Sequence, residues 1–221
     1  MTRRITALEP QQKRRDRVNM FLDGVYALSL STAVLARYGY AKGDSLSPAE
    51  IEALKEADRH ESAYEAALQL LSYRPRSIAE VRRRLLQRHF EPPLVDEVLH
   101  RLTDHGLLDD TSFAQYWKDN RDAHSPRGER LLKAELRQKG VDDEVIAEAV
   151  DDVDEEENAY RAVISRARRY KALDFRTFHQ KVGGFLLRRG FGYEVARTVT
   201  DRLWEECRDA GAEDDQWSSD E

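Results

Sequence analysis

From Ala63 onward, apolar residues recur at intervals of three and four, the spacing that places side chains on one face of an α-helix. No persistent alternation of apolar and polar residues is present in this part, so the pattern predicts helices and no strands. The helices are expected over residues 63–72, 78–89, 93–105, 111–123, 129–139, 143–152, 155–171, 175–189 and 193–207.

The helical part contains an internal repeat of about fifty residues. The apolar positions of one segment superpose on those of the next two segments, and a basic residue followed by a glycine or histidine recurs near the end of each middle helix. The equivalent apolar positions are 81/132/182, 85/136/186, 90/141/191, 94/145/195, 98/149/199 and 102/153/203. Gly140 and Gly190 stand where a helix would end, since glycine adopts the left-handed conformation without steric cost. Each repeat is therefore predicted to contain three short helices.

A different pattern fills the first sixty residues. Asp23-Gly24 separates two runs of alternating apolar residues, 18–22 and 25–30, which is a strong signal for a tight hairpin. A short strand is expected over 5–8, a short helix over 32–38, and a further helix opening at Ser47-Pro48 with a Ser cap. Lys13, Arg14, Arg15 and Arg17 are expected in an exposed turn before the hairpin.

The predicted fold is mainly α, with three tandem three-helix repeats forming an elongated curved body and a small N-terminal β-hairpin and helix module. The expected domains are the N-terminal module over 1–60, the repeats over 61–109, 110–154 and 155–208, and an acidic disordered tail over 209–221.

Charge is distributed in blocks, although the net charge of −6 is modest. Residues 142–157 contain ten acids and no Lys or Arg, and 158–189 contain nine bases and one acid. Residues 73–90 contain six arginines and one glutamate, and 205–221 contain eight acids and one arginine. Such blocks suit a protein that touches phosphates, an acidic protein surface, or both; ordinary solvated helix faces are the alternative.

The motifs of the common enzyme classes are missing. The sequence has no phosphate-binding GxxxxGK[ST] loop, no GxGxxG after a strand and no HExxH. The six histidines form no zinc pair, and Cys207 is the single cysteine. Asp109-Asp110 is interpreted as a helix cap in preference to a metal site. We therefore expect that the protein is not an enzyme and has no catalytic residue, metal or cofactor. The pattern contains neither a membrane span nor a signal peptide, so we expect the protein in the reducing cytoplasm. We also expect it to be a monomer.

Three-helix units with basic faces invite comparison with helix-turn-helix DNA readers, although no cluster that would read base edges is evident. Basic side chains along such faces would hold phosphates without reading sequence. The candidate contacts to DNA or a partner are Arg74, Arg76, Arg82, Arg83, Arg84, Arg88, Arg121, Arg127, Lys139, Arg166, Arg168, Arg169, Lys181, Arg188 and Arg189.

An ordered series of motifs runs through about residues 63–207. The motifs are Ala67-Leu68, Leu70-Leu71-Ser72-Tyr73-Arg74-Pro75-Arg76-Ser77, Glu80-Val81-Arg82, Gly106-Leu107-Leu108-Asp109-Asp110, Phe113-Ala114, Arg121, Pro126-Arg127-Gly128, Glu135-Leu136, Lys139-Gly140-Val141 and Arg188-Arg189-Gly190-Phe191. This series resembles the RecX family. The N-terminal module is similar to an extension that some members carry.

The resemblance implies a role as well as a fold. It implies binding to the RecA recombinase as its filament on DNA, restraint of the ATPase, strand-exchange and coprotease activities in DNA repair and the SOS response, and weak binding to single- and double-stranded DNA without sequence specificity. It carries over no catalytic residue.

The sequence departs from the family pattern at two places. His89 stands where the family has glycine, so it must adopt the left-handed conformation or the helix must end differently. Gly183-Gly184 lies inside a predicted helix and marks either close packing or a softer third repeat.

Two other functions fit the same pattern. A stand-alone DNA-binding regulator would bind duplex tightly and with a steep salt dependence without a recombinase. A helical protein–protein scaffold would bind its partner regardless of charge reversal at Arg83, Arg84 and Arg188.

Overall fold

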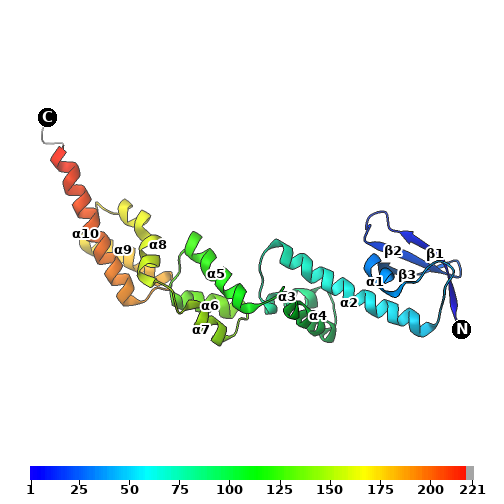
Figure 1. Ribbon diagram of the computed structural model, residues 1–221. Helices are drawn as coiled ribbons and strands as arrows, with labels where there is room; N and C mark the ends of the chain where they lie inside the picture. The colour runs from blue at the N-terminus through cyan, green and yellow to red at the C-terminus, as the bar shows by residue number, and fades with distance from the viewer. Residues whose placement is uncertain (218–221) are drawn as a thin grey trace. The chain divides into compact units, whose positions relative to one another are not determined.

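The computed structural model describes the backbone of residues 1–217 and the side chains of residues 1–209. The chain divides into two compact units, which we describe separately. The N-terminal unit comprises residues 1–76 and 81–108, and the C-terminal unit comprises residues 77–80 and the chain from Asp109 onward. Figure 1 shows the order of the elements, and within the described residues helices predominate.

A four-stranded antiparallel sheet opens the N-terminal unit. Its strands are β1 (Arg3–Pro10), β2 (Arg17–Leu22), β3 (Val25–Ser31) and β4 (Ser45–Leu46), in the order β3-β2-β1-β4. The predicted hairpin is confirmed, because Asp23 and Gly24 both have positive φ, at 52° and 82°. Helix α1 (Thr32–Tyr38) also has its predicted bounds and ends at the left-handed Gly39. The two-residue strand β4 was not predicted.

The alternation of Tyr26, Leu28 and Leu30 along the second strand of the hairpin predicts that all three share one face, and one of them does not. Leu28 and Leu30 are buried as expected, but Tyr26 is 55% exposed. The pairing of β2 with β3 shifts register between Met20 and Phe21, so that Met20 pairs with Leu28 and Phe21 with Tyr26. The extra residue in β3 is a bulge, and it turns the side chains beyond it to the other face of the sheet.

Arg17 does not lie in an exposed turn, as was predicted. It begins β2, and its guanidinium donates to the Asp58 carboxylate at 2.6 Å, with both side chains about seven-eighths buried. Asp58 lies on α2 (Pro48–Tyr73) and also accepts the Ser31 backbone N–H at 2.7 Å. Lys13, Arg14 and Arg15 are exposed as predicted.

Helix α2 is one continuous helix where the sequence suggested two. It begins at the predicted Ser47 cap, with the reciprocal Ser47–Glu50 capping box in place, and contains no internal glycine or proline to interrupt it. With α2, helices α3 (Ile78–Gln87) and α4 (Pro92–Asp104) form the first repeat.

The other two repeats lie in the C-terminal unit. The second consists of α5 (Asp110–His124), α6 (Glu129–Gln138) and α7 (Asp143–Val150). The third consists of α8 (Glu155–Arg169), α9 (Phe175–Arg188) and α10 (Tyr193–Trp217). Most of the predicted acidic tail, 209–221, lies outside the residues whose side chains are described.

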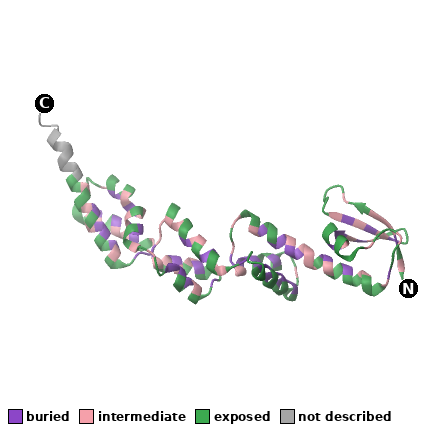
Figure 2. Cartoon of the chain, viewed as in Figure 1, coloured by how far each residue is buried: buried purple, intermediate pink, exposed green. Residues whose placement is uncertain are grey.

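The repeat is visible in the burial of equivalent residues. Val81, Leu132 and Val182 are fully buried, and the same is true of the next equivalent set, Leu85, Leu136 and Leu186. Figure 2 shows buried segments, coloured purple, alternating with exposed segments along the helices. The helical spacing of apolar residues thus identifies the core of each three-helix repeat.

His89 resolves the first departure from the family pattern. Its φ is 63°, so the histidine adopts the left-handed conformation that Gly140 and Gly190 adopt in the other repeats, with φ of 78° and 90°. For Gly183 and Gly184, a side chain would meet its nearest neighbours at 3.7 and 3.4 Å, which is ordinary contact. Close packing therefore does not require glycine at those two positions.

Candidate nucleic-acid interface

Four of the predicted basic residues come together in the C-terminal unit, and we call them the arginine cluster: Arg121, Arg127, Arg166 and Arg189. They come from the last turn of α5, the loop before α6, α8 and the end of α9. Local sequence places three of them near helix ends: α5 ends at Ser125, Gly128 caps α6, and Gly190 ends α9 just after Arg189. Arg166 lies in the last turn of α8. Two repeats therefore supply one concentration of positive charge.

Glu135 on α6 is the negative centre of this group. Its carboxylate accepts hydrogen bonds from the Arg121 Nε at 2.8 Å and the Trp117 Nε1 at 2.9 Å. The Arg127 Nε lies 3.4 Å from the same carboxylate, but its geometry makes no hydrogen bond, and this buried nitrogen is left without a hydrogen-bond partner among the described atoms. The Glu135 side chain is only 16% exposed, so it is largely shielded from water, and its contacts with the arginines hold it in place.

The other two members of the cluster share an aromatic ring. The guanidinium carbons of Arg166 and Arg189 lie 4.5 and 4.9 Å from the centroid of the Phe185 ring, within the range of a cation–π contact. Arg189 also donates to the Ser125 hydroxyl at 2.7 Å. Neither arginine forms an ion pair with a described carboxylate.

Positive charge therefore exceeds negative charge in the cluster. Burial lowers the pKa of Arg189, and repulsion from Arg127, Arg166 and Arg121 lowers that pKa further. Because an arginine side chain stays protonated in proteins, this repulsion is relieved by an incoming anion and not by loss of a proton. A phosphate is well suited, since guanidinium groups bind its oxygens in pairs.

Three other predicted residues hold the fold together. Lys139 pairs with Glu80 at 3.0 Å, Arg82 forms an ion pair with Asp96, and Arg76 donates its Nε to the Leu70 carbonyl at 2.9 Å. A partner would have to compete with these contacts. The Lys139 pair is largely buried and favours a structural role, whereas the Arg82 pair is about half exposed and contributes little to stability.

The remaining predicted residues lie at or near the surface, outside the arginine cluster. Arg74 donates to the Pro75 carbonyl at 2.7 Å, Arg84 reaches Gln87 at 3.4 Å, and Lys181 lies 5.5 Å from the centre of the Tyr170 ring. The exposed ones are Arg83, Arg84, Arg88, Arg168, Arg169, Lys181 and Arg188.

Sequence reasoning missed the organising residues of the arginine cluster. Glu135 was noted only as part of a motif, and Trp117, Ser125 and Phe185 were given no role. A signal for Glu135 was present, because it stands three positions after the apolar Leu132 on α6. Residues three apart lie on the same helix face, where a charged residue needs a partner.

Other chemistry finds little support among the described residues. No group of three His, Cys, Asp or Glu side chains in this part of the chain is placed to hold a metal ion. Asp109 caps α5 as predicted, by accepting the backbone N–H groups of Thr111 and Ser112. Within the same part of the chain, no helix has the length and apolar character needed to cross a membrane.

Four family models match the chain. They are described as the regulatory protein RecX N-terminal domain (residues 3–47) and the first, second and third RecX three-helix domains (residues 63–102, 109–150 and 154–200). The chain is 33% identical to the regulatory protein RecX of Bacillus subtilis over 202 residues, 90% of this chain and 76% of the relative. It is 32% identical to that of Listeria welshimeri over 200 residues, 89% of this chain and 74% of the relative.

Solved structures show the same likeness. A crystal structure of regulatory protein RecX matches with a TM-score of 0.70 and 28% identity, covering 90% of this chain and 99% of that one. The RecX structure from Lactobacillus salivarius matches with a TM-score of 0.61 and 27% identity, covering 66% of this chain and 97% of that one. The curated relatives are named regulatory proteins and not enzymes.

Proposed function

This chain belongs to the RecX family of regulatory proteins, and we propose that it restrains the RecA recombinase by binding the RecA filament on DNA. Occupying the filament would block homologous duplex, repressor substrates and filament growth. ATP hydrolysis, strand exchange and coprotease activity would fall together.

The arginine cluster is the observation that carries this proposal. It places two guanidiniums at the Glu135 carboxylate and two at the Phe185 ring, and the latter two have no carboxylate partner among the described residues. Such a site attracts DNA phosphates whatever the base sequence. The acidic block 142–157, in the same unit, would complement basic protein surface.

The test is to add purified protein to RecA filaments on single-stranded DNA and to measure ATP hydrolysis and strand exchange. We expect both rates to fall as the protein is added. No change at several-fold excess over RecA would refute the inhibitory role, and faster strand exchange would show that the protein stabilises the filament instead.

A matched pair of variants tests the cluster itself. Arg166→Ala removes an exposed guanidinium that has no ion pair with a described residue, whereas Arg176→Ala removes an exposed base on α9 outside the cluster. Each lost phosphate contact should reduce the slope of log affinity against log salt by about 1. We expect this reduction, with weaker inhibition, for Arg166→Ala alone; equal effects of the two variants would contradict a specific role for the cluster.

The same assays separate the two alternatives. Tight, saturable and salt-steep binding to duplex without RecA would favour a stand-alone DNA-binding regulator. Capture of RecA that is indifferent to charge reversal at Arg83, Arg84 and Arg188 would favour a protein–protein scaffold. A pull-down of RecA with and without DNA distinguishes these outcomes.

A further inference from the structure

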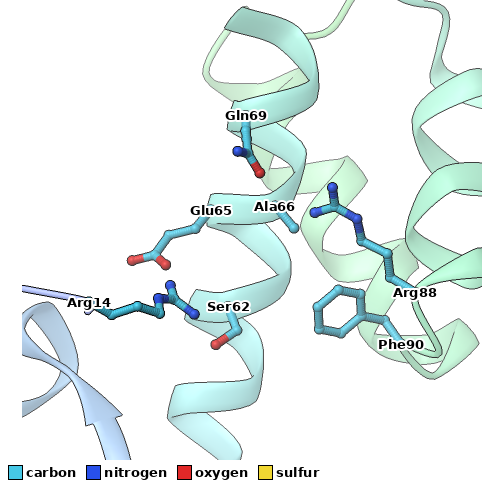
Figure 3. Close-up of a pocket in the computed structure, with 7 residues that line it drawn as sticks. All are labelled: Arg14, Ser62, Glu65, Ala66, Gln69, Arg88 and Phe90. Atoms are coloured by element: carbon cyan, nitrogen blue, oxygen red, sulfur yellow. The ribbon is translucent and has the colours of Figure 1, made fainter. Parts of the chain in front are cut away.

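A second candidate site lies in the N-terminal unit, in a hollow of about 520 Å³. Arg14, from the loop between β1 and β2, and Arg88, at the end of α3, reach into it from opposite sides of α2 (Figure 3). The middle of α2 lines the same hollow with Ser62 and Gln69. The volume is within the range of sites for small ligands, about 300–1,000 Å³.

Phe90, which lines this hollow, is more exposed than the equivalent residues of the other two repeats. Its equivalents in the second and third repeats, Val141 and Phe191, are buried at 5% and 2% exposure. Phe90 is only partly buried and lines the hollow beside Arg88. The first repeat thus leaves accessible an aromatic ring at a position that the other repeats use for their cores.

The polar groups around this ring suit a nucleotide. The Arg88 guanidinium has no hydrogen bond or ion pair with any described residue, whereas Arg14 pairs with Asp16 at 2.8 Å. The Gln69 amide and the Ser62 hydroxyl can each donate and accept a hydrogen bond, as the edge of a base requires. An aromatic ring beside arginine is the combination that single-strand binding proteins use for base stacking and phosphate contact.

We propose that this hollow binds one unpaired nucleotide of single-stranded DNA, with its base against Phe90 and its phosphate at Arg88 and Arg14. The proposal goes beyond filament inhibition, because phosphate contacts alone do not distinguish single strands from duplex. A base can reach Phe90 only when it is unstacked and unpaired. The site therefore gives the protein a preference for single strands that does not depend on RecA.

Glu65 opposes the binding of a phosphate in the same hollow. Burial raises the pKa of Glu65, and Asp16 and Glu61 raise it further, while Arg14 and Arg17 act in the opposite direction. Because its charged form repels an anion, Glu65→Gln should tighten nucleotide binding at neutral pH. The affinity of the unmodified protein should rise as the pH falls toward the titration of Glu65, and Glu65→Gln should remove most of that rise.

The direct test is photo-crosslinking of the full-length protein to a single-stranded oligonucleotide that carries 5-iodouracil, followed by tryptic mass spectrometry. We expect an adduct on the peptide of residues 89–101, which contains Phe90. Fluorescence anisotropy gives the affinities. Phe90→Leu keeps an apolar side chain but removes the ring face, and it should weaken binding of the oligonucleotide about tenfold. Phe90→Tyr keeps a ring and should bind the oligonucleotide as tightly as the unmodified protein.

The charge of the site is tested with a matched pair. Arg88→Ala should reduce the salt slope by about 0.7, the value for one single-strand phosphate contact, whereas Lys42→Ala, an exposed base outside the hollow, should not. Thermal unfolding followed by circular dichroism checks that each variant is folded.

Several outcomes would overturn the proposal. They are adducts found only outside residues 89–101, equal affinity of Phe90→Leu and the unmodified protein, and displacement of the single strand by an equal concentration of duplex. Displacement by a glutamate-rich peptide that Phe90→Leu binds equally well would instead identify an acidic-peptide site. None of these measurements involves RecA, so their failure is distinguishable from failure of the inhibitory role.

Discussion

The Lys139 ammonium lies 3.0 Å from the Glu80 carboxylate, although 59 positions of sequence separate the two residues. Glu80 is only 5% exposed at its side chain, and the Lys139 ammonium also lies 4.7 Å from the centre of the Trp117 ring. Next to this pair, the Ser77 hydroxyl donates to the Lys139 carbonyl at 2.6 Å. The pair therefore fixes the start of α3 to the end of α6.

We expect Lys139→Met to destabilise the C-terminal unit, because it removes the ammonium from a buried carboxylate. The expected loss is about 1–3 kcal/mol in the free energy of unfolding. Urea denaturation followed by tryptophan emission measures it, with Trp117 as a probe beside the substituted residue. The matched control is Lys133→Met on α6, whose ion pair with Glu129 is partly exposed; it should cost less than about 1 kcal/mol. Equal costs would contradict the importance of the Glu80 contact.

Gly140 is predicted to be intolerant of alanine for two separable reasons. Its φ is +78°, and a Cβ there would lie 2.5 Å from the Ala79 Cβ. Gly106 has a similar φ of +65°, and a Cβ there would meet nothing within 4 Å. Gly106→Ala should therefore lower the free energy of unfolding only by the conformational cost, about 1–2 kcal/mol. Gly140→Ala should lower the free energy of unfolding by about 1–3 kcal/mol more, because of the close approach to Ala79. Chemical denaturation of both variants checks this, and similar losses would exclude tight packing at Gly140.

His89→Gly should stabilise the protein, since His89 is exposed and holds a φ of 63°. Relief of the left-handed strain should exceed the extra chain entropy of glycine and give a gain of about 0.5–1 kcal/mol. Arg83→Gly, in the interior of α3, should instead lower the free energy of unfolding by about 1 kcal/mol. A shift in melting temperature in opposite directions is the expected result; destabilisation by both variants would contradict it.

Asp110 should make stability depend on pH. Burial raises its pKa, and Asp109 and Asp142 raise it further, although the Ile78 backbone N–H donates to it at 2.9 Å. An acid with a raised folded-state pKa binds more protons when folded, so its unfavourable contribution grows as the pH rises from the unfolded-state pKa through the folded-state one.

Asp110→Asn should therefore stabilise the protein at neutral pH, and this gain should disappear at pH values below the unfolded-state pKa, where the aspartate is neutral in both states. Melting temperatures measured across the acid range check the sign. A gain that stays constant with pH would show that the carboxylate charge is not its cause.

The repeat and most of the elements follow from the pattern of apolar residues, although α2 was expected as two helices and β4 was not expected. Helical spacing identified Val81, Leu132 and Val182 as equivalent core residues, and all three are fully buried. Asp23-Gly24 identified the hairpin, and the position of His89 at the end of α3 indicated the left-handed conformation that its φ of 63° shows. These features are local, because a periodic pattern and a turn residue constrain only the chain within a few positions.

Which side chains meet depends on the tertiary fold. It buried Arg17 against Asp58, turned Tyr26 outward through a bulge, and gathered Arg121, Arg127, Arg166 and Arg189 around Glu135 and Phe185. Periodicity tells which face of a helix is covered but not which residue covers it. Partners for a buried charge are chosen by distance in space, and chain segments far apart in sequence supplied them here.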